Sequence, residues 1–599
     1  MRSPARVLNS LTKHSQTTEY RFERLYRILF NEEMYYLAYQ RIYAKPGNMT
    51  QGADGKTIDR MSLPRIEKLI LSLKDESYSP QPSRRVHIPK KNGKTRPLGV
   101  PSFDDKLVQE VVRMVLEAIY EGHFEDTSHG FRPHRSCHTA LNAVQKTFTG
   151  KKWFIEGDIK GFFDNVNHDI LIDILKERIS DERSIRLIRK FLRAGYLEQW
   201  RFHGTYSGIP QGGIISPVLA NIYLDKLDKY MKEYATGFDR GNRVRACREY
   251  EALTYQKRLV MRELKTATNN VERKVLVKRL KEIDKTRSAM PCFDPMDGNF
   301  KRLKYVRYAD DFLIGIIVSK VKIKDDIKRF LADRLALELS DEKTLVTHTE
   351  KPAKFLGYEV TVRKSNLQKR NKRGSLSRVY GNKVRLKVTT EVIKKKLLEL
   401  GVLKFSYHNG HEQWIPKHRS ELINNDDLEI LDSYNAEIRG FYNYYSIANN
   451  ASELNTFHYI MQYSMYKTFA GKYRTTVRRI CRKYKRNGVF TVGYTVKNGK
   501  AKERRLYNEG FKRKRPSYDR SIDRCPNPMP GVSTTSLIDR LKAQKCELCG
   551  ATDNLVMHHV RKLGELKGKE NWEKLMIARR RKTMAVCGSC HQKIHHGTF

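Results

Sequence analysis

The chain of 599 residues has no long apolar run and comparatively few acidic residues. No window approaches the ~18 consecutive apolar residues of a membrane span, so we expect no membrane partner. Asp and Glu number 67 against 116 Lys and Arg, which gives a formal net charge of +49 at pH 7. A charge of that size favours polyanionic partners. The 39% of hydrophobic and 10% of aromatic residues supply ordinary cores and exclude low-complexity disorder.

Cysteine is also scarce, with nine residues in the whole chain. Four of them form two Cys-x-x-Cys pairs near the C-terminus, and the other five are scattered singly. This distribution favours a local metal site in a reducing compartment over a disulfide framework. The paired spacing is typical of a tetrahedral structural Zn²⁺ site, for which we expect four ligands: Cys546, Cys549, Cys587 and Cys590.

Periodicity predicts a helix and three strands, and three aspartates at the strand ends form a second group of candidate metal ligands. Apolar residues recur at helical spacing over 104–120, behind Asp104 as the expected cap. A strand over 153–159 places Asp158 at its end, and two strands over 303–308 and 312–318 are closed by a turn that contains Asp310 and Asp311. Held together, these three carboxylates would repel one another unless a cation lay between them. Mg²⁺ suits carboxylates and phosphates, and two such ions support in-line phosphoryl transfer.

The sequences of these segments resemble motifs of reverse transcriptases. Tyr308-Ala309-Asp310-Asp311 resembles their catalytic box, and Asp158 to Phe163 resembles their other metal-binding motif. Five further motifs follow in the same order as in the family: Ile88-Pro89-Lys90 with Arg96-Pro97-Leu98-Gly99, Gly130-Phe131-Arg132-Pro133, Gly208 to Gly213 with Ser216-Pro217, Glu342-Lys343-Thr344, and Phe355-Leu356-Gly357. The motifs most resemble those of group II intron-encoded proteins.

The resemblance implies roles for five more residues. Lys90 and Arg96 lie six apart around a turn that contains glycine, so both cations can close on one nucleotide triphosphate. Phe163 would collide with a ribose 2′-hydroxyl and favour dNTPs. Gln211 would contact the incoming nucleotide from a glycine-rich loop, and Lys343 would protonate the departing pyrophosphate.

The C-terminal segment resembles H-N-H endonucleases. The resemblance implies that His558, His591 and His595 bind one divalent ion, for which we expect Mg²⁺, and that His559 takes a proton from water. The central Asn of that family has no counterpart at the usual spacing. Asn571 is the nearest candidate.

We therefore expect a multidomain α+β chain. It would contain a right-hand polymerase, with fingers and palm around an antiparallel sheet and a helical thumb, and a small zinc-containing ββα H-N-H domain. The expected divisions are an N-terminal RNA-binding extension over 1–80, fingers and palm over 81–365 with a charged helical insertion over 239–300, a thumb and maturase domain over 366–470, a basic DNA-binding region over 471–545, and the endonuclease over 546–599. Residues 471–545 hold 22 Lys and Arg against five Asp and Glu.

The resemblance implies a protein that binds its own intron RNA, assists splicing, nicks double-stranded DNA and copies RNA from a DNA primer with dNTPs. It implies a location in the bacterial cytoplasm or an organelle, without secretion. Two alternatives remain: a maturase that only assists splicing, and a fusion of reverse transcriptase and nuclease that serves defence. Retention of Asp158, Asp310 and Asp311 counts against the first. The maturase-like helix over 428–445 and the basic linker count against the second.

Overall fold

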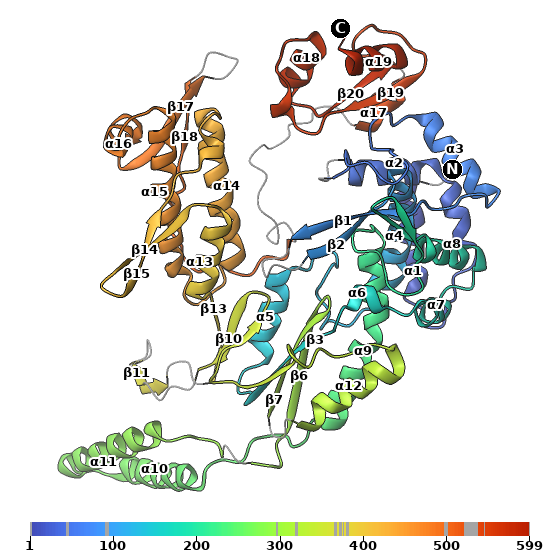
Figure 1. The fold of residues 1–599 in the computed structure, drawn as a ribbon. Coiled ribbons are helices and arrows are strands. Elements are labelled where there is room, and N and C mark those ends of the chain that lie inside the picture. Colours follow the sequence, from blue (N-terminus) through green and yellow to red (C-terminus); the bar gives the residue numbers. More distant parts are fainter. Residues whose placement is uncertain are drawn as a thin grey trace.

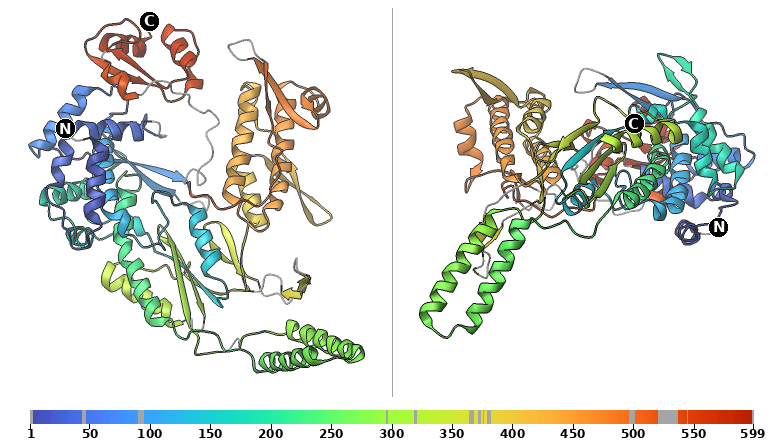
Figure 2. Two further views of the ribbon diagram at one scale, coloured as in Figure 1. Left: turned by 180° about the vertical axis from the view of Figure 1, so that it is seen from behind. Right: turned by 90° about the horizontal axis from the view of Figure 1, so that it is seen from below.

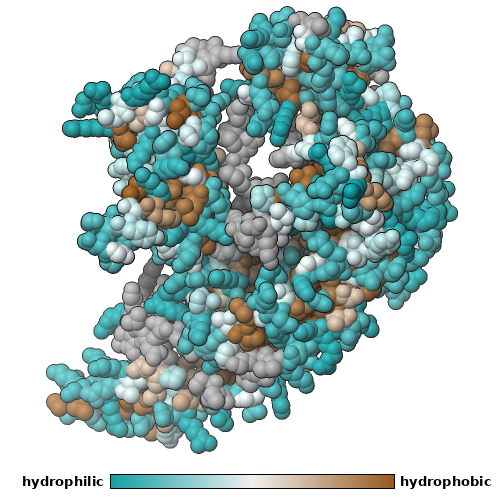
Figure 3. All heavy atoms as spheres, in the orientation of Figure 1, coloured by the Kyte–Doolittle hydropathy of each residue, from teal (hydrophilic) through white to brown (hydrophobic). Residues whose placement is uncertain are grey.

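The computed structural model describes most of the chain. It covers residues 3–43, 47–89, 95–294, 297–317, 321–363, 368–370, 374, 376–378, 382–495, 501–519, 537–543 and 545–597. In Figure 1 the helices within residues 390–484 lie on the left, the C-terminal elements at the top and the N-terminal helices on the right. Hydrophilic residues dominate the face seen in Figure 3, as the large net charge leads one to expect. None of the helices in these ranges is both long and apolar enough to cross a membrane.

Residues 3–78, here called the N-terminal region, are mostly helical. Their helices are α1 (Pro4–Ser15), α2 (Glu32–Ile42) and α3 (Leu63–Lys74). The side chain of Asn31 accepts a hydrogen bond from the Glu33 amide and so caps α2, while Ser62 caps α3 in the same way. Buried tyrosines of α2 share one hydrophobic core with α4 (Phe103–Tyr120).

Helix α4 confirms the helix expected over 104–120, but the expected cap is wrong. The helix begins at Phe103 and follows Ser102. The carboxylate of Asp104 instead accepts hydrogen bonds from Arg65 Nε at 2.7 Å and Lys56 Nζ at 2.8 Å. These ion pairs tie α4 to the N-terminal region.

A four-stranded antiparallel sheet in the order β6-β7-β3-β8 forms the centre of the molecule. Its strands are β3 (Trp153–Asp158), β6 (Arg302–Tyr308), β7 (Asp311–Ile317) and β8 (Leu345–His348). Helices α5 (Cys137–Thr147) and α9 (Ser216–Phe238) pack against β6, and α12 (Val321–Leu335) packs against α9. The strands and hairpin expected here are confirmed with ends shifted by about one residue; Val318 lies outside the described residues.

A second four-stranded sheet has the order β2-β1-β4-β5. It consists of β1 (Ser83–Pro89), β2 (Thr95–Val100), β4 (Tyr196–Glu198) and β5 (Arg201–His203). Between β3 of the first sheet and β4 of the second, the chain forms three helices: α6 (Phe162–Asn165), α7 (His168–Lys176) and α8 (Glu182–Arg193). Asn167 caps α7, where the sequence predicts a helix start.

The segment expected as a charged insertion forms a helical hairpin. Its helices are α10 (Arg248–Thr266) and α11 (Asn270–Ala289), and they project away from the rest of the molecule (Figure 2). Only Val260, Leu276 and Ile283 form its buried core in the described residues. The hairpin therefore holds itself together with little apolar contact elsewhere.

Residues 382–517, here called the C-terminal helical body, share one core. The elements are β13 (Val384–Lys387), α13 (Thr390–Glu399), β14 (Leu403–His408), β15 (His411–Pro416), α14 (Asp427–Tyr445), α15 (Leu454–Lys472), α16 (Val477–Tyr484), β16 (Lys485–Arg486), β17 (Val489–Thr495) and β18 (Ala501–Arg505). Strand β13 pairs with β10 (Tyr358–Val362), which pairs with β9 (Ala353–Phe355). Short strands β11 (Gln368–Arg370) and β12 (Leu376–Arg378) form a separate hairpin.

The boundary expected at residue 470 is not a break in packing. Phe490, Val492 and Leu506 of the basic segment are buried against α14 and α15 in the same core. The high charge of this segment comes from its exposed positions, while its buried positions are apolar. Residues 520–536 of the expected DNA-binding region lie outside the described part of the chain.

Residues 545–597, here called the cysteine–histidine domain, follow helix α17 (Leu537–Lys542). An antiparallel pair of β19 (Leu555–His559) and β20 (Thr583–Cys587) packs with α19 (Gly588–His596), and α18 (Asn571–Arg579) lies between the strands in sequence. This is the expected ββα arrangement. The domain lies against α2 and against residues 59–61, which precede α3 (Figure 1).

Candidate polymerase and nuclease sites

The three aspartates expected at one site lie at one end of the central sheet. Asp158 and Asp311 are paired residues on the neighbouring antiparallel strands β3 and β7, so their side chains lie on the same face. Tyr308 pairs with Asp311, which leaves Ala309 and Asp310 as the two turn residues of the β6–β7 hairpin. The structure thus brings the three carboxylates together although about 150 residues separate Asp158 from the other two in the sequence.

The electrostatics of this cluster favour a cation. Desolvation and the charges of Asp310 and Asp158 raise the pKa of Asp311 to about 7. Desolvation, assisted by Asp158, also raises the pKa of Asp310. Lys343 Nζ donates to Asp158 Oδ2 at 2.7 Å and balances one of the three charges. Carboxylates that are this costly to ionise together suit one or more divalent ions with oxygen ligands.

A buried arginine, which the sequence analysis missed, holds the turn in place. The side chain of Arg307 is fully buried and donates to both carboxylate oxygens of Asp228. The same guanidinium donates to the carbonyl of Ala309 at 2.8 Å. Ala309 has a φ of 56°, so the turn adopts a left-handed conformation that this contact helps to retain. Strand β6 carries three basic residues, Arg302, Lys304 and Arg307, so no local pattern distinguishes the buried Arg307 from the exposed Lys304.

Gly130, from the Gly-Phe-Arg-Pro motif, supports the turn from the other side. A Cβ atom at Gly130 would lie 2.3 Å from the amide nitrogen of Ala309. Only glycine permits this approach. The neighbouring His129 amide donates to the Arg307 carbonyl at 2.9 Å and fixes the two segments together.

Three of the expected nucleotide-binding residues lie next to one another beside the carboxylates. Arg96 Nε donates to Gln211 Oε1 at 2.8 Å, and the positive charge of Arg96 acts on Asp310. The Gly99 amide donates to the Gln211 carbonyl at 2.7 Å, and the Ile209 amide donates to the Phe163 carbonyl at 2.7 Å. Gly212 has a φ of 118° and no room for a Cβ against the Gly99 carbonyl. Of the other two expected residues, Lys343 contacts Asp158, and Lys90 lies outside the described residues.

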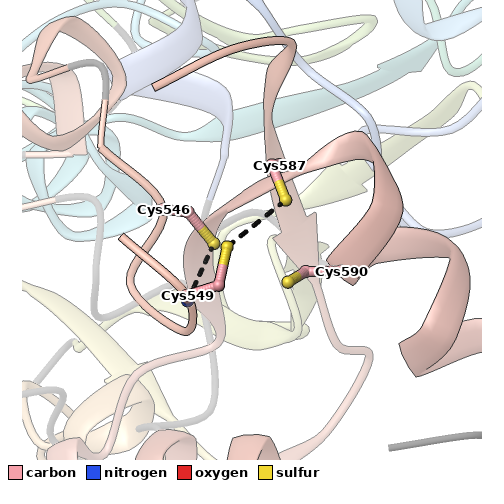
Figure 4. Close-up of side chains that lie close together, drawn as sticks. All are labelled: Cys546, Cys549, Cys587 and Cys590. Carbon is pink, nitrogen blue, oxygen red and sulfur yellow. Dashed lines mark hydrogen bonds between the residues drawn. The ribbon is translucent and has the colours of Figure 1, made fainter. Parts of the chain in front are cut away.

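The four cysteines of the two Cys-x-x-Cys pairs converge on one point (Figure 4). All four sulfur atoms lie within 4.8 Å of one another, and the sulfurs of Cys549 and Cys587 are 3.6 Å apart. In a tetrahedral site with Zn–S bonds of about 2.3 Å, neighbouring sulfurs are about 3.8 Å apart. The arrangement is compatible with Zn²⁺ and leaves no position open for substrate.

The three histidines expected to bind a second ion also meet, but a fourth residue joins them. His558 on β19 and His591 and His595 on α19 surround the carboxylate of Asp59, and the four ligand atoms lie within 4.8 Å of one another. Asp59 belongs to the N-terminal region. The sequence analysis missed it because no local pattern connects residues that lie 500 positions apart.

His559, the expected base, is buried and fully hydrogen-bonded. Its Nδ1 donates to the Met557 carbonyl at 3.1 Å, and its Nε2 lies 2.9 Å from the hydroxyl of Tyr39 on α2. Burial lowers the pKa of both His558 and His559 to about 4. Both imidazoles are therefore neutral at pH 7, as a metal ligand and a proton acceptor must be. Asn571 begins α18, and its neighbour Trp572 packs edge to face on His558.

Family comparisons agree with this geometry. Three models match the chain: reverse transcriptase (RNA-dependent DNA polymerase) over residues 88–255, type II intron maturase over 382–515, and AI2M/AI1M-like HNH endonuclease over 546–591. The maturase match continues across residue 470, as the packing does. Fold and sites together define an RNA-directed DNA polymerase that carries maturase and HNH endonuclease domains.

Comparison with individual proteins identifies the family to which the chain belongs. The group II intron-encoded protein LtrA of Lactococcus lactis subsp. cremoris is 43% identical, over 100% of both chains. A putative COX1/OXI3 intron 1 protein of Saccharomyces cerevisiae is 34% identical over 96% of this chain and 69% of its own length. Protein YkfC of Escherichia coli is 33% identical over 58% of this chain and 84% of its own length. The chain belongs to the group II intron-encoded proteins and is a reverse transcriptase and HNH endonuclease.

Replacement of Arg307 tests how the turn is held. Arg307→Met leaves the buried carboxylate of Asp228 without its positive partner, so we expect the free energy of unfolding to fall by about 3–5 kcal/mol. Lys304→Met, at an exposed position of the same strand, is the control and should change it by less than about 0.5 kcal/mol. Thermal unfolding of both variants gives the comparison. Equal stability of the two variants would contradict the role given to the buried pair.

Replacement of Cys549 tests the four-cysteine site. We expect Cys549→Ser to lose its bound metal and to unfold residues 545–597, because structural metal binding contributes directly to folding. Cys247→Ser, which lies outside the cluster, should keep the metal. Metal content by mass spectrometry and limited proteolysis of the same samples provide the measurement. Full metal content in Cys549→Ser would rule out the site.

Proposed function

We propose that Asp158, Asp310 and Asp311 hold two Mg²⁺ ions and make this end of the central sheet the polymerase site. Two ions held by these carboxylates would supply activation of the primer 3′-hydroxyl and stabilisation of the leaving oxygen. The observation that carries the proposal is the pairing of Asp158 with Asp311 across β3 and β7, beside Asp310 in the turn. It also favours an active polymerase over a scaffold that only assists splicing.

The neighbouring residues would select and orient the dNTP. Arg96, together with Lys90, would bind the triphosphate, and Gln211 would contact the nucleotide from its position against Arg96. Phe163 would exclude a ribose 2′-hydroxyl. Lys343 would donate a proton to pyrophosphate after leaving Asp158, and its raised pKa in contact with that carboxylate keeps the proton available.

We assign the second sheet to the fingers, the central sheet to the palm and the C-terminal helical body to the thumb. The partners in this proposal are the protein's own intron RNA, an RNA template with its DNA primer, and a double-stranded DNA target. The exposed Lys and Arg of the C-terminal helical body, which contains most of the basic segment 471–545, would bind phosphates, and the apolar residues beneath them hold the fold.

The cysteine–histidine domain would nick one strand of the DNA target to create the primer end. His558, His591 and His595 would hold one divalent ion, for which we propose Mg²⁺, and His559 would accept a proton from water. The four cysteines would hold a structural Zn²⁺ that keeps α19 and β20 in place. Support comes from the convergence of the three imidazoles and from the neutral state of His559.

A substitution at Asp310 tests the polymerase assignment. We expect Asp310→Ala to lower primer extension on an RNA template by at least about 10³-fold, because a carboxylate that holds the reacting ions is lost. Binding of intron RNA should remain, since Asp310 contributes no affinity for phosphate. Asp333→Ala, at an exposed position of α12, is the matched control. Extension by Asp310→Ala at the control rate would refute the assignment.

A substitution at His559 tests the nuclease assignment. His559→Ala should lower nicking of a supercoiled target, in the presence of intron RNA, by about 10²–10⁴-fold, the usual contribution of a general base. Zinc content and primer extension should not change, because both depend on other residues. His596→Ala removes an exposed imidazole at the end of the same domain and serves as control. Nicking by His559→Ala at the rate of this control would show that another group is the base.

A further inference from the structure

The N-terminal region inserts one carboxylate into the histidine cluster of the cysteine–histidine domain. Asp59 Oδ2 lies 3.0 Å from His591 Nε2 and 3.0 Å from His595 Nε2. Asp59 Oδ1 lies 3.6 Å from His558 Nδ1. Three nitrogens from one domain and a carboxylate from another thus face one point.

His558 points independently to an ion at this place. Its side chain is 3% exposed, and neither ring nitrogen has a hydrogen-bond partner among the described residues. Buried polar groups are normally paired, because an unpaired one costs free energy. A metal ion shared with His591, His595 and Asp59 would satisfy the imidazole.

We propose that Asp59 is the fourth ligand of a closed metal site between the two domains, and that this closed state holds the nuclease inactive. Three protein ligands leave positions on a divalent ion free for water and for the scissile phosphate, and Asp59 would take one of these positions. Asp59 fills the position that the scissile phosphate would need. The inference rests on the proposed nuclease function and adds its regulation.

Tyr39 blocks the other half of the same site. Since the Met557 carbonyl can only accept, Nδ1 of His559 carries the hydrogen, and Nε2 accepts one from the Tyr39 hydroxyl. The lone pair that would take a proton from water is therefore occupied. Both side chains are buried, with 0% exposure for Tyr39 and 4% for His559.

Backbone contacts fix this docked state. The Met557 amide donates to the Met61 carbonyl at 2.8 Å, and the Arg60 amide donates to the Met557 carbonyl at 3.1 Å. The His559 amide donates to Asp59 Oδ1 at 2.8 Å. Met61 and Met557 are both fully buried in the core of the N-terminal region. Access of DNA to the histidines thus requires residues 59–61 to separate from β19.

An ion pair outside the site strengthens the same interface. Lys542 Nζ on α17 donates to Glu33 Oε1 on α2 at 2.9 Å and lies 4.4 Å from the ring centre of Tyr36. Both partners are exposed, so the pair itself contributes little, about 0–1 kcal/mol. The inhibitory contact is therefore concentrated on Asp59, Tyr39 and the Met61–Met557 bridge.

The test compares Asp59→Ala, Tyr39→Phe and the control Asp75→Ala in the full-length protein. Asp75 is an exposed aspartate of the N-terminal region that binds only Ser77 among the contacts described for it. Nicking of supercoiled DNA is measured without RNA, and Mn²⁺ affinity is measured by competition with a chelator. Hydrogen exchange of the Met557 amide reports the docked state independently of activity.

We expect Asp59→Ala to raise RNA-independent nicking at least about tenfold, as a loss of about 1.4 kcal/mol of docking free energy would. Mn²⁺ affinity should fall in the same variant, and the Met557 amide should exchange faster. Tyr39→Phe should raise nicking and lower Mn²⁺ affinity less than Asp59→Ala does, because it weakens docking but keeps the carboxylate ligand. Asp75→Ala should match the wild type in every measurement.

Opposite changes in nicking and affinity separate an inhibitory ligand from a catalytic one. If nicking and Mn²⁺ affinity fall together in Asp59→Ala, the reaction needs Asp59 and the inhibition is refuted. Unchanged affinity would refute Asp59 as a ligand. If the wild type nicks DNA with intron RNA but Asp59→Ala gains nothing, the inference alone fails. If no variant nicks under any condition, the proposed nuclease function fails as well, whereas affinity and exchange still test the closed site.

Discussion

Repulsion between like charges at the end of the central sheet is the constraint on which the rest of the structure depends. Asp158, Asp310 and Asp311 are held together by strand pairing and a two-residue turn, although their ionisation is mutually unfavourable. The turn keeps its place because Arg307, buried and neutralised by Asp228, also donates to the Ala309 carbonyl. A stable fold thus maintains a local cluster of acidic groups whose mutual repulsion a bound cation would relieve.

The cysteine–histidine domain likewise brings metal-binding side chains close together. Four thiols and, separately, three imidazoles converge at distances that suit a shared ion. The two clusters differ in what completes them. The cysteines are all local to one domain, which agrees with a structural role. The histidines are completed by Asp59 of another domain, so their state depends on how the two domains are docked. This dependence ties the nuclease to the part of the chain that packs against the polymerase.

Local sequence patterns predict many of these elements and metal-binding clusters. The β6–β7 hairpin and α14 were found from periodicity, and the Cys-x-x-Cys pairs from their spacing, because each signal lies within a few residues. Tertiary contacts decided the rest. Asp104 pairs with Lys56 and Arg65 instead of capping α4, and Asp59 joins histidines 500 positions away. Charge composition suggested a boundary at residue 470, but the buried side chains of Phe490 and Val492 continue the core beneath the exposed basic residues.

Anomalous X-ray diffraction tests most directly whether these clusters bind cations. Crystals of the protein with template, primer and a dNTP in Mn²⁺ should show peaks between Asp158, Asp310 and Asp311, and data at the zinc edge should show one peak between the four cysteines. Absence of a manganese peak at the three aspartates, with nucleic acid and dNTP bound, would contradict the account.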